Sequence, residues 1–242
     1  MMNRHIASVS FGKDSLAMLL KLIELQYPLD EVVFYDTGME FEAIYHIRDA
    51  VLPLLKEKGI KYTEMKPEYD FVWKMFEKPV NGRKNGFHYG YSWCGGRCRW
   101  GTTDKLKTLE NYCKGSFEYV GIAADEPKRL VKERNGNKLF PLADWGMSEA
   151  DCLEYCYSKG FRWKEGNVEL YEILDRVSCW CCANKNLKEL KNIYLHLPEY
   201  WHRLKELQSR TDRPMKKSGT VFELEERFEN ESKNHRNPVK GS

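Results

Sequence analysis

Residues 5–15 read His-Ile-Ala-Ser-Val-Ser-Phe-Gly-Lys-Asp-Ser, and this stretch decides the fold. A short apolar run ends at a glycine-containing loop, after which Leu16, Leu19, Leu20 and Ile23 recur at helical spacing. A strand that passes through a tight loop into an amphipathic helix opens a βαβ unit. The stretch therefore predicts an α/β protein with its first loop at the carboxyl end of a strand.

The following residues repeat this alternation. Predicted strands are 31–35, 61–65 and 117–122, and predicted helices are 41–58, 102–113, 148–159 and 186–209, the last interrupted at Pro198. Strands that alternate with helices form parallel sheets, and ligands of such sheets gather at the carboxyl ends of the strands. We expect a Rossmann-like twisted parallel sheet flanked by helices, with a C-terminal helical extension.

Composition narrows the class of protein. The 242 residues are 42% hydrophobic and 31% charged, which suits a folded core, and the net charge of +3 indicates no partner by itself. No apolar run approaches the roughly 18 residues of a membrane span, and the first residues lack the apolar region of a signal peptide. We expect a cytoplasmic protein without a membrane partner.

The loop Ser10-Phe11-Gly12-Lys13-Asp14-Ser15 is the sharpest motif. Backbone N–H groups at the start of a helix, together with the helix dipole, favour bound anions. Gly12 permits close approach of a phosphate, Lys13 supplies charge, and Ser10 and Ser15 supply hydroxyl groups. The spacing is not that of a Walker A loop. The alternative is an ordinary turn in which Asp14 or Ser15 is the N-cap residue.

The loop resembles the Ser-Gly-Gly-Lys-Asp-Ser PP-loop of N-type ATP pyrophosphatases and PAPS reductases, with Phe11 in place of a glycine. Phe11 fits such a loop if its backbone needs no positive φ. Residues 36–42 are similar to the Asp-Thr-Gly-x-x-Phe-x-Glu motif of the PAPS reductases, and residues 121–129 to their Gly-Ile-Arg-x-x-Glu-x-x-Arg segment, with Ala123 replacing the first arginine. Residues 140–145 resemble their Tyr-Pro-Leu-x-x-Trp segment. The chain is identified as a member of this family.

The resemblance implies a nucleotide site that takes ATP or another adenine nucleotide with Mg²⁺. The expected binding residues are Ser10, Phe11, Gly12, Lys13, Asp14, Ser15, Asp36, Thr37, Gly38 and Arg129. The expected catalytic residues are Lys13, Asp14, Asp125 and Glu126. Asp36, Asp125 and Glu126 follow predicted strands, where this type of sheet binds its ligand. For Asp36 the alternative role is to cap a turn.

Eight cysteines in a reducing compartment indicate metal or redox chemistry more than disulfides. Two groups about 80 residues apart supply four thiolates, from Cys94, Cys98, Cys179 and Cys182. Sulfur ligation alone permits either zinc or a [4Fe–4S] cluster. The resemblance to APS reductases and DndC-like proteins favours iron–sulfur. Cys181 is an alternative ligand or a free thiol, whereas Cys113, Cys152 and Cys156 are expected to be small core residues.

The stretch 78–107 is basic and aromatic, with seven Lys or Arg residues and one acid, Asp104. Cations neutralise phosphates and aromatic rings stack on bases, so this pattern is typical of nucleic-acid binding. A cleft that neutralises one small anionic nucleotide explains the charges equally well.

Three functions remain open. A PAPS or APS reductase needs a C-terminal nucleophilic cysteine, and residues 183–242 contain none. An ATP pyrophosphatase would adenylate its substrate and take part in iron–sulfur-dependent sulfur transfer onto tRNA or DNA, with a cysteine desulfurase as the sulfur source. The third is a non-catalytic nucleotide-binding module with a structural metal. The predicted segments are a PP-loop domain (1–165), a cysteine-containing helical region (166–228) and a disordered tail (229–242).

Overall fold

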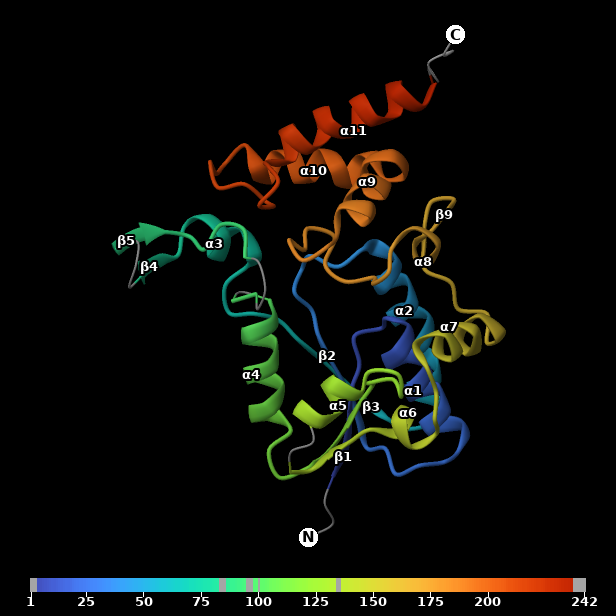
Figure 1. Cartoon of the computed structure of the whole chain (residues 1–242). Coiled ribbons are helices and arrows are strands. Elements are labelled where there is room, and N and C mark those ends of the chain that lie inside the picture. Colours follow the sequence, from blue (N-terminus) through green and yellow to red (C-terminus); the bar gives the residue numbers. More distant parts are fainter. Residues whose placement is uncertain (1–3, 83–85, 95–97, 100, 134–135, 237–242) are drawn as a thin grey trace. The chain divides into compact units, whose positions relative to one another are not determined.

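The computed structural model describes residues 4–82, 86–94, 98–99, 101–133 and 136–236 (Figure 1). The chain forms two compact units. The first contains Met1–Glu68 and Asp104–Glu165, and the second contains Tyr69–Thr103 and Gly166–Ser242. The chain therefore leaves the first unit after residue 68 and returns to it at residue 104.

A parallel sheet is the centre of the first unit. Its strands within the described residues are β1 (His5–Ser8), β2 (Glu31–Tyr35), β3 (Lys61–Met65), β6 (Phe117–Val120) and β7 (Lys138–Leu139), in the spatial order β3-β2-β1-β6-β7. Every pairing between them is parallel, with Ala7 of β1 opposite Val32 of β2 and Tyr119 of β6. All residues of β2 are buried, as expected for a strand covered on both faces.

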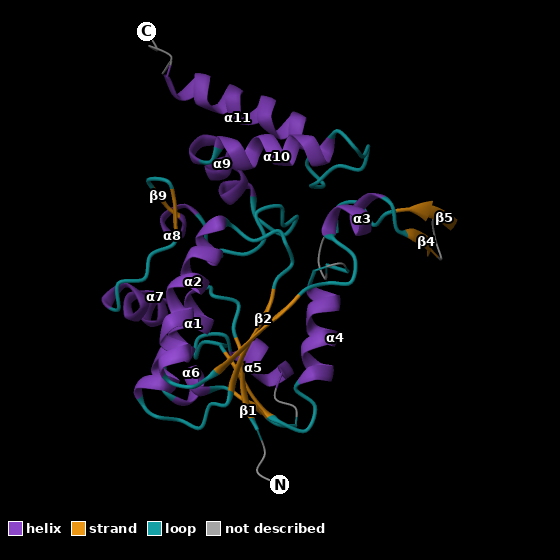
Figure 2. Ribbon diagram, turned by 180° about the vertical axis from the view of Figure 1, so that it is seen from behind, coloured by secondary structure: helices purple, strands orange, loops and turns teal. Residues whose placement is uncertain are grey.

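Helices cover both faces of this sheet (Figure 2). They are α1 (Lys13–Glu24), α2 (Glu42–Glu57), α4 (Thr102–Tyr112), α5 (Pro127–Glu133), α6 (Pro141–Asp144) and α7 (Glu149–Ser158), followed by the short strand β8 (Lys164–Glu165). Leu109 of α4 and Cys113 pack against Ile6, Val33 and Tyr35 on one face of the sheet. The predicted α/β class with a parallel sheet is confirmed.

The second unit is mainly helical. It contains α3 (Phe71–Phe76), β4 (Pro79–Gly82), β5 (Gly86–Tyr89), β9 (Val168–Glu169), α8 (Leu170–Ile173), α9 (Leu187–His196), α10 (Pro198–Gln208) and α11 (Val221–Arg236). The long helix expected over 186–209 is two helices, because the chain leaves the helical conformation at Leu197 and Pro198 begins the next helix. The antiparallel pair β4–β5 lies in residues 78–101, whose six glycines by themselves predict a long loop.

Helix α11 extends into the segment 229–242 that composition predicts to be a mobile tail. The side chain of Phe228 is buried, and the Lys191 ammonium lies 2.8 Å from a carboxylate oxygen of Glu231. These contacts hold the first part of that segment in helix, and residues 237–242 lie outside the described residues. No helix in the described part of the chain has both the length and the apolar character needed to cross a bilayer.

Candidate functional site

The loop Ser10–Ser15 joins the end of β1 to the start of α1. The backbone N–H of Ser10 donates to the Ser15 hydroxyl at 3.1 Å, and this hydroxyl donates to the Gly12 carbonyl oxygen at 3.1 Å. Gly12 is the N-cap residue of α1, so neither Asp14 nor Ser15 takes that position. Glycine has no side chain that could cap the helix. The N–H groups at the start of α1, which attract anions, are therefore not capped by the side chain of the N-cap residue.

Phe11 adopts a positive φ of 57°, the left-handed conformation that favours glycine. Its side chain is fully buried and meets Phe34 edge to face, with ring centroids 5.2 Å apart. The Trp163 indole N–H donates to the Phe11 carbonyl oxygen at 2.8 Å. Burial and this hydrogen bond therefore hold Phe11 at a positive φ, so the condition stated from the sequence, that Phe11 needs no positive φ, is not met.

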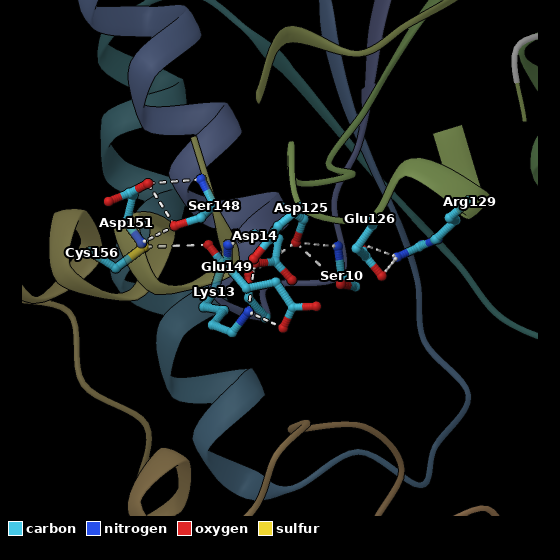
Figure 3. A network of polar contacts seen from close by, with 12 residues as sticks. Ser10, Lys13, Asp14, Asp125, Glu126, Arg129, Ser148, Glu149, Asp151 and Cys156 are labelled. Carbon is cyan, nitrogen blue, oxygen red and sulfur yellow. Dashed lines mark hydrogen bonds and ion pairs between the residues drawn. The ribbon is translucent and has the colours of Figure 1, made fainter. Parts of the chain in front are cut away.

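Lys13 is only 6% exposed, and its ammonium lies between two carboxylates (Figure 3). Its Nζ atom is 2.7 Å from Asp14 Oδ1 and 2.8 Å from Glu149 Oε2. Burial lowers the pKa of Lys13, but the two carboxylates raise it more, and the net pKa lies above the ordinary lysine value. Lys13 therefore carries a positive charge at neutral pH, at the start of α1.

Two further carboxylates, Asp125 and Glu126, lie in the same group of side chains (Figure 3). Burial raises the pKa of Asp14, and the negative charges of Glu149 and Glu126 raise it further, against the lowering effect of Lys13. The Glu149 backbone N–H donates to Asp125 Oδ1 at 3.0 Å. Glu126 pairs with Arg129, with a shortest N–O distance of 3.0 Å. The four predicted catalytic residues thus lie in one acidic group of side chains.

Glu149 is a site residue that sequence reasoning missed. Ser148 accepts a hydrogen bond from the Asp151 N–H as the N-cap of α7, and Glu149 is the first residue of that helix. The Ser-x-x-Asp capping pattern locates the start of the helix, but no local pattern indicates that the next side chain reaches a lysine 136 residues earlier.

Gly121 explains how the end of β6 comes close to the loop. A Cβ atom at this position would lie 2.8 Å from the Ser15 Cα atom, closer than real Cβ atoms approach backbone. Only glycine permits this contact without a shift, so Gly121 brings the segment with Asp125 and Glu126 against the start of α1.

Asp36, Thr37 and Gly38 form a turn after β2. Asp36 Oδ1 accepts hydrogen bonds from the Gly38 N–H at 2.8 Å and the Tyr45 hydroxyl at 2.7 Å. Thr37 donates to Glu40 at 2.9 Å, and Gly38 has a φ of 73° that suits glycine. These contacts are those of the turn-capping alternative, and a role of the three residues toward nucleotide stays a prediction.

All four predicted metal ligands belong to the second unit. A hydrogen bond from Cys98 lowers the pKa of the Cys94 thiol to about 6 against the effect of burial, helped by the Arg99 backbone N–H and the charges of Arg213 and Arg99. The Gly101 N–H donates to the Cys98 sulfur at 3.2 Å. The lowered pKa favours the thiolate form of Cys94, and the thiolate is the form that binds metals.

A buried lysine, Lys185, lies near the second cysteine group. The ammonium of Lys185 donates to the Arg176 carbonyl oxygen at 3.2 Å. Burial lowers the pKa of Lys185, while Glu189 and then Cys182, Cys179 and Cys181 act in the opposite direction. Within the described residues, no three or more His, Cys, Asp or Glu side chains come together as a metal-binding group.

The remaining cysteines are core residues, as predicted. Burial raises the pKa of both Cys113 and Cys152 to about 12. Cys156 donates to the Lys13 carbonyl oxygen at 3.4 Å, next to the loop Ser10–Ser15. Cys181 is fully buried, so it is not an accessible surface thiol.

Comparison with known proteins matches residues 4–182 to the phosphoadenosine phosphosulfate reductase domain. Two proteins of Methanocaldococcus jannaschii, uncharacterized protein MJ0066 and uncharacterized protein MJ0973, are 26% and 27% identical over 218 and 213 residues, or 82% and 80% of this chain. The matches cover 40% and 46% of those proteins, so the chain spans less than half their length. Among solved structures, the U34-tRNA thiolase NcsA of Methanococcus maripaludis, with its [4Fe–4S] cluster, is similar at a TM-score of 0.45 and 14% identity, covering 99% of this chain and 76% of that one.

Proposed function

Since the chain belongs to the phosphoadenosine phosphosulfate reductase family, we propose that it is an ATP pyrophosphatase of the sulfur-transfer type. In this proposal the enzyme binds ATP at Ser10–Ser15, cleaves the bond between the α- and β-phosphates and adenylates an oxygen of its acceptor. A sulfur nucleophile then replaces that oxygen.

One observation carries the proposal: a charged lysine at the start of α1 lies within a group of carboxylates. The Lys13 ammonium is held 2.7 Å from Asp14 and 2.8 Å from Glu149. In the nucleotide-bound enzyme this cation and the N-terminal N–H groups of α1 would bind the phosphates. Asp14, Asp125 and Glu126 provide carboxylate oxygens, the ligands that Mg²⁺ prefers.

The proposed chemistry has two steps. A carbonyl oxygen of the acceptor attacks the α-phosphorus of ATP, and pyrophosphate leaves with its charge neutralised by Lys13. A bound Mg²⁺, held by these carboxylates, would neutralise further phosphate charge. Hydrosulfide then attacks the activated carbon, and AMP leaves with the original oxygen. Asp36 and Arg129 are proposed to contact the ribose and the phosphates, as the family resemblance implies.

Cys94, Cys98, Cys179 and Cys182 would hold a [4Fe–4S] cluster, with zinc as the alternative. The thiolate character of Cys94 and the placement of all four residues in one unit support this ligand set. When bound by all four cysteines, such a cluster would link the segment that carries Cys94 and Cys98 to the segment that carries Cys179 and Cys182. The cationic Arg99 and Arg213 near Cys94 would offset its negative charge.

The proposed acceptor is a nucleic acid, with tRNA as the first candidate and DNA as the second. The basic and aromatic composition of residues 78–107 supports this choice. A cysteine desulfurase with a thiol reductant is the proposed source of hydrosulfide. None of the eight cysteines forms a disulfide, which agrees with the cytoplasmic location that we propose.

Pyrophosphate release from ATP and Mg²⁺, measured with and without tRNA, tests the activity. Lys13→Ala is expected to weaken ATP binding about 10- to 150-fold, because a hydrogen bond to a charged group contributes about 1.5–3 kcal/mol. Lys21→Ala is the matched control: Lys21 lies on the same helix, but its ammonium is 5.6 Å from the Trp145 ring centroid. Calorimetry should show near-native affinity for this control.

Two results would contradict the proposal. Equal ATP affinity in Lys13→Ala and native protein would remove the loop as the binding site. Tight ATP binding without pyrophosphate release in the presence of tRNA, other RNA or DNA would favour the non-catalytic module instead.

A further inference from the structure

Strands β4 and β5 form a two-stranded antiparallel ribbon that follows α3 in the second unit (Figure 2). Pro79 pairs with Tyr89, and Asn81 pairs with Phe87. Because side chains alternate between the faces of a strand, Phe87 and Tyr89 share one face of the ribbon. Their rings meet edge to face, with centroids 5.3 Å apart.

The described part of the second unit leaves most of this aromatic face exposed. Phe87 is 64% exposed and Tyr89 is 65% exposed, more than any other Phe, Tyr or Trp among the described residues. A single exposed ring is ordinary, but two adjacent rings on one ribbon face are a surface built for contact with a partner.

The base of the ribbon is fixed to α3. The Gly90 N–H donates to the Lys78 carbonyl oxygen at 2.7 Å, and the Ser92 N–H donates to the Met75 carbonyl oxygen at 2.8 Å. A Cβ atom on Gly90 would lie only 2.1 Å from the Met75 oxygen, so the chain passes this point only as glycine. The two rings are therefore presented by an anchored ribbon, which reduces the entropy lost when a partner binds.

The charge of the surrounding segment selects the kind of partner. Residues 78–103 contain five Lys or Arg residues and no Asp or Glu. Within the described residues, Lys78 Nζ and Arg99 Cζ lie 5.4 Å and 5.7 Å from the centroid of the Tyr91 ring, next to the base of the ribbon. Arg83, Lys84 and Arg97 lie outside the described residues. Cations on the same segment as the two exposed rings complement a chain of phosphates and unstacked bases.

We propose that the β4–β5 ribbon is a base-stacking element for RNA. Phe87 and Tyr89 stack on unpaired bases of the acceptor, and Lys78 and Arg99 contact its phosphates. This inference rests on the proposed function, because it takes a nucleic acid as the acceptor. It adds that the acceptor is recognised through unpaired bases and not through a duplex.

Fluorescence anisotropy with a labelled tRNA transcript, at constant salt, tests the stacking. Phe87→Ala and Tyr89→Ala are each expected to weaken tRNA binding about 5- to 150-fold, the range for one stacked base. Phe87→Leu should lose affinity as well, whereas Phe87→Trp should retain it, because stacking needs an aromatic ring and not only apolar surface. Phe222→Ala, at an exposed aromatic residue of α11, is the matched control and should bind tRNA like the native protein.

Two further measurements identify the ligand. A fully paired RNA duplex of similar length should bind more weakly than the tRNA and should not respond to Phe87→Ala. Lys78→Ala should reduce the slope of log affinity against log salt by about 0.7–0.9, the change expected for one lost phosphate contact.

The outcomes separate this inference from the proposed function. If Phe87→Ala with Tyr89→Ala leaves tRNA affinity unchanged while tRNA-dependent pyrophosphate release persists, the stacking element is refuted and the proposed function stands. If the native protein binds ATP but neither binds nor responds to tRNA, other RNA or DNA, both fail. Ring-dependent binding to anionic lipid vesicles, with no ring-dependent binding of tRNA, would assign the surface to membranes and overturn the inference.

Discussion

Phe11 combines a fully buried ring with a φ of 57°, and these two features predict opposite effects of truncation. Removing a buried phenylalanine ring to alanine costs about 3–5 kcal/mol. The left-handed backbone costs a residue with a Cβ atom about 1–2 kcal/mol, and glycine avoids that cost. Phe11→Ala should therefore lower the free energy of unfolding by about 3–5 kcal/mol, and Phe11→Gly by about 1 kcal/mol less.

Urea denaturation followed by circular dichroism and tryptophan fluorescence measures both variants. Fluorescence is informative because Trp163 donates its indole N–H to the Phe11 carbonyl oxygen. Phe41 supplies a matched control, since it is also fully buried but has a φ of −64°. At that position Phe41→Gly should be no more stable than Phe41→Ala, because the backbone conformation does not favour glycine.

Equal stability of Phe11→Ala and Phe11→Gly would show that the left-handed backbone has no energetic cost at this position and would contradict the prediction. A loss below about 1 kcal/mol in Phe11→Ala would refute the assigned packing of the ring instead.

Three other perturbations test separate features. Burial raises the pKa of Glu31, but hydrogen bonds from Thr63, Tyr112 and Lys61 outweigh it and leave the pKa below the ordinary value of 4.5. The stabilisation from ionised Glu31 is complete above pH 4.5 and is lost as pH falls through the lower pKa of the folded state. In Glu31→Gln the free energy of unfolding should therefore depend less steeply on pH in this acid range. Gly121→Ala should destabilise the protein by about 1–3 kcal/mol through overpacking against the start of α1, as measured by thermal unfolding. Metal analysis of anaerobically purified protein should find no bound iron in Cys98→Ser and Cys182→Ser, whereas the control Cys113→Ser should retain iron. Zinc in place of iron would refute the iron–sulfur assignment.

The strand–loop–helix of residues 5–15 was predictable because its signals are local. Apolar residues at strand and helix spacing, with Gly12 between them, determine β1 and α1 without help from distant residues. The parallel order of the sheet also follows from the alternation of strands and helices. The conformation of Phe11 did not follow, because its backbone is held by Trp163, which lies 152 residues later.

Other features of the candidate sites depend on contacts that no sequence window contains. Glu149 reaches Lys13 only after α7 packs on α1. The β4–β5 ribbon carries a local signal, since Asn81-Gly82 and Asn85-Gly86 are turn dipeptides, but the abundance of glycine around them favours the interpretation as loop. Only the pairing of β4 with β5 shows that the aromatic residues of this stretch lie in a strand and not in a loop.

The division of the chain into units changes how the cysteines are understood. In the sequence, Cys94 and Cys98 lie in the first half of the chain, about 80 residues before Cys179 and Cys182. The segment 69–103 instead belongs to the unit formed by 166–242, so both pairs lie in one folding unit, whereas Lys13 and its carboxylates lie in the other. A cluster bound by the two pairs would thus connect distant segments of the second unit and stabilise that unit. Loss of iron in Cys98→Ser with unchanged ATP affinity would then mean that the two units carry separable tasks, ATP binding in the first and cluster binding in the second.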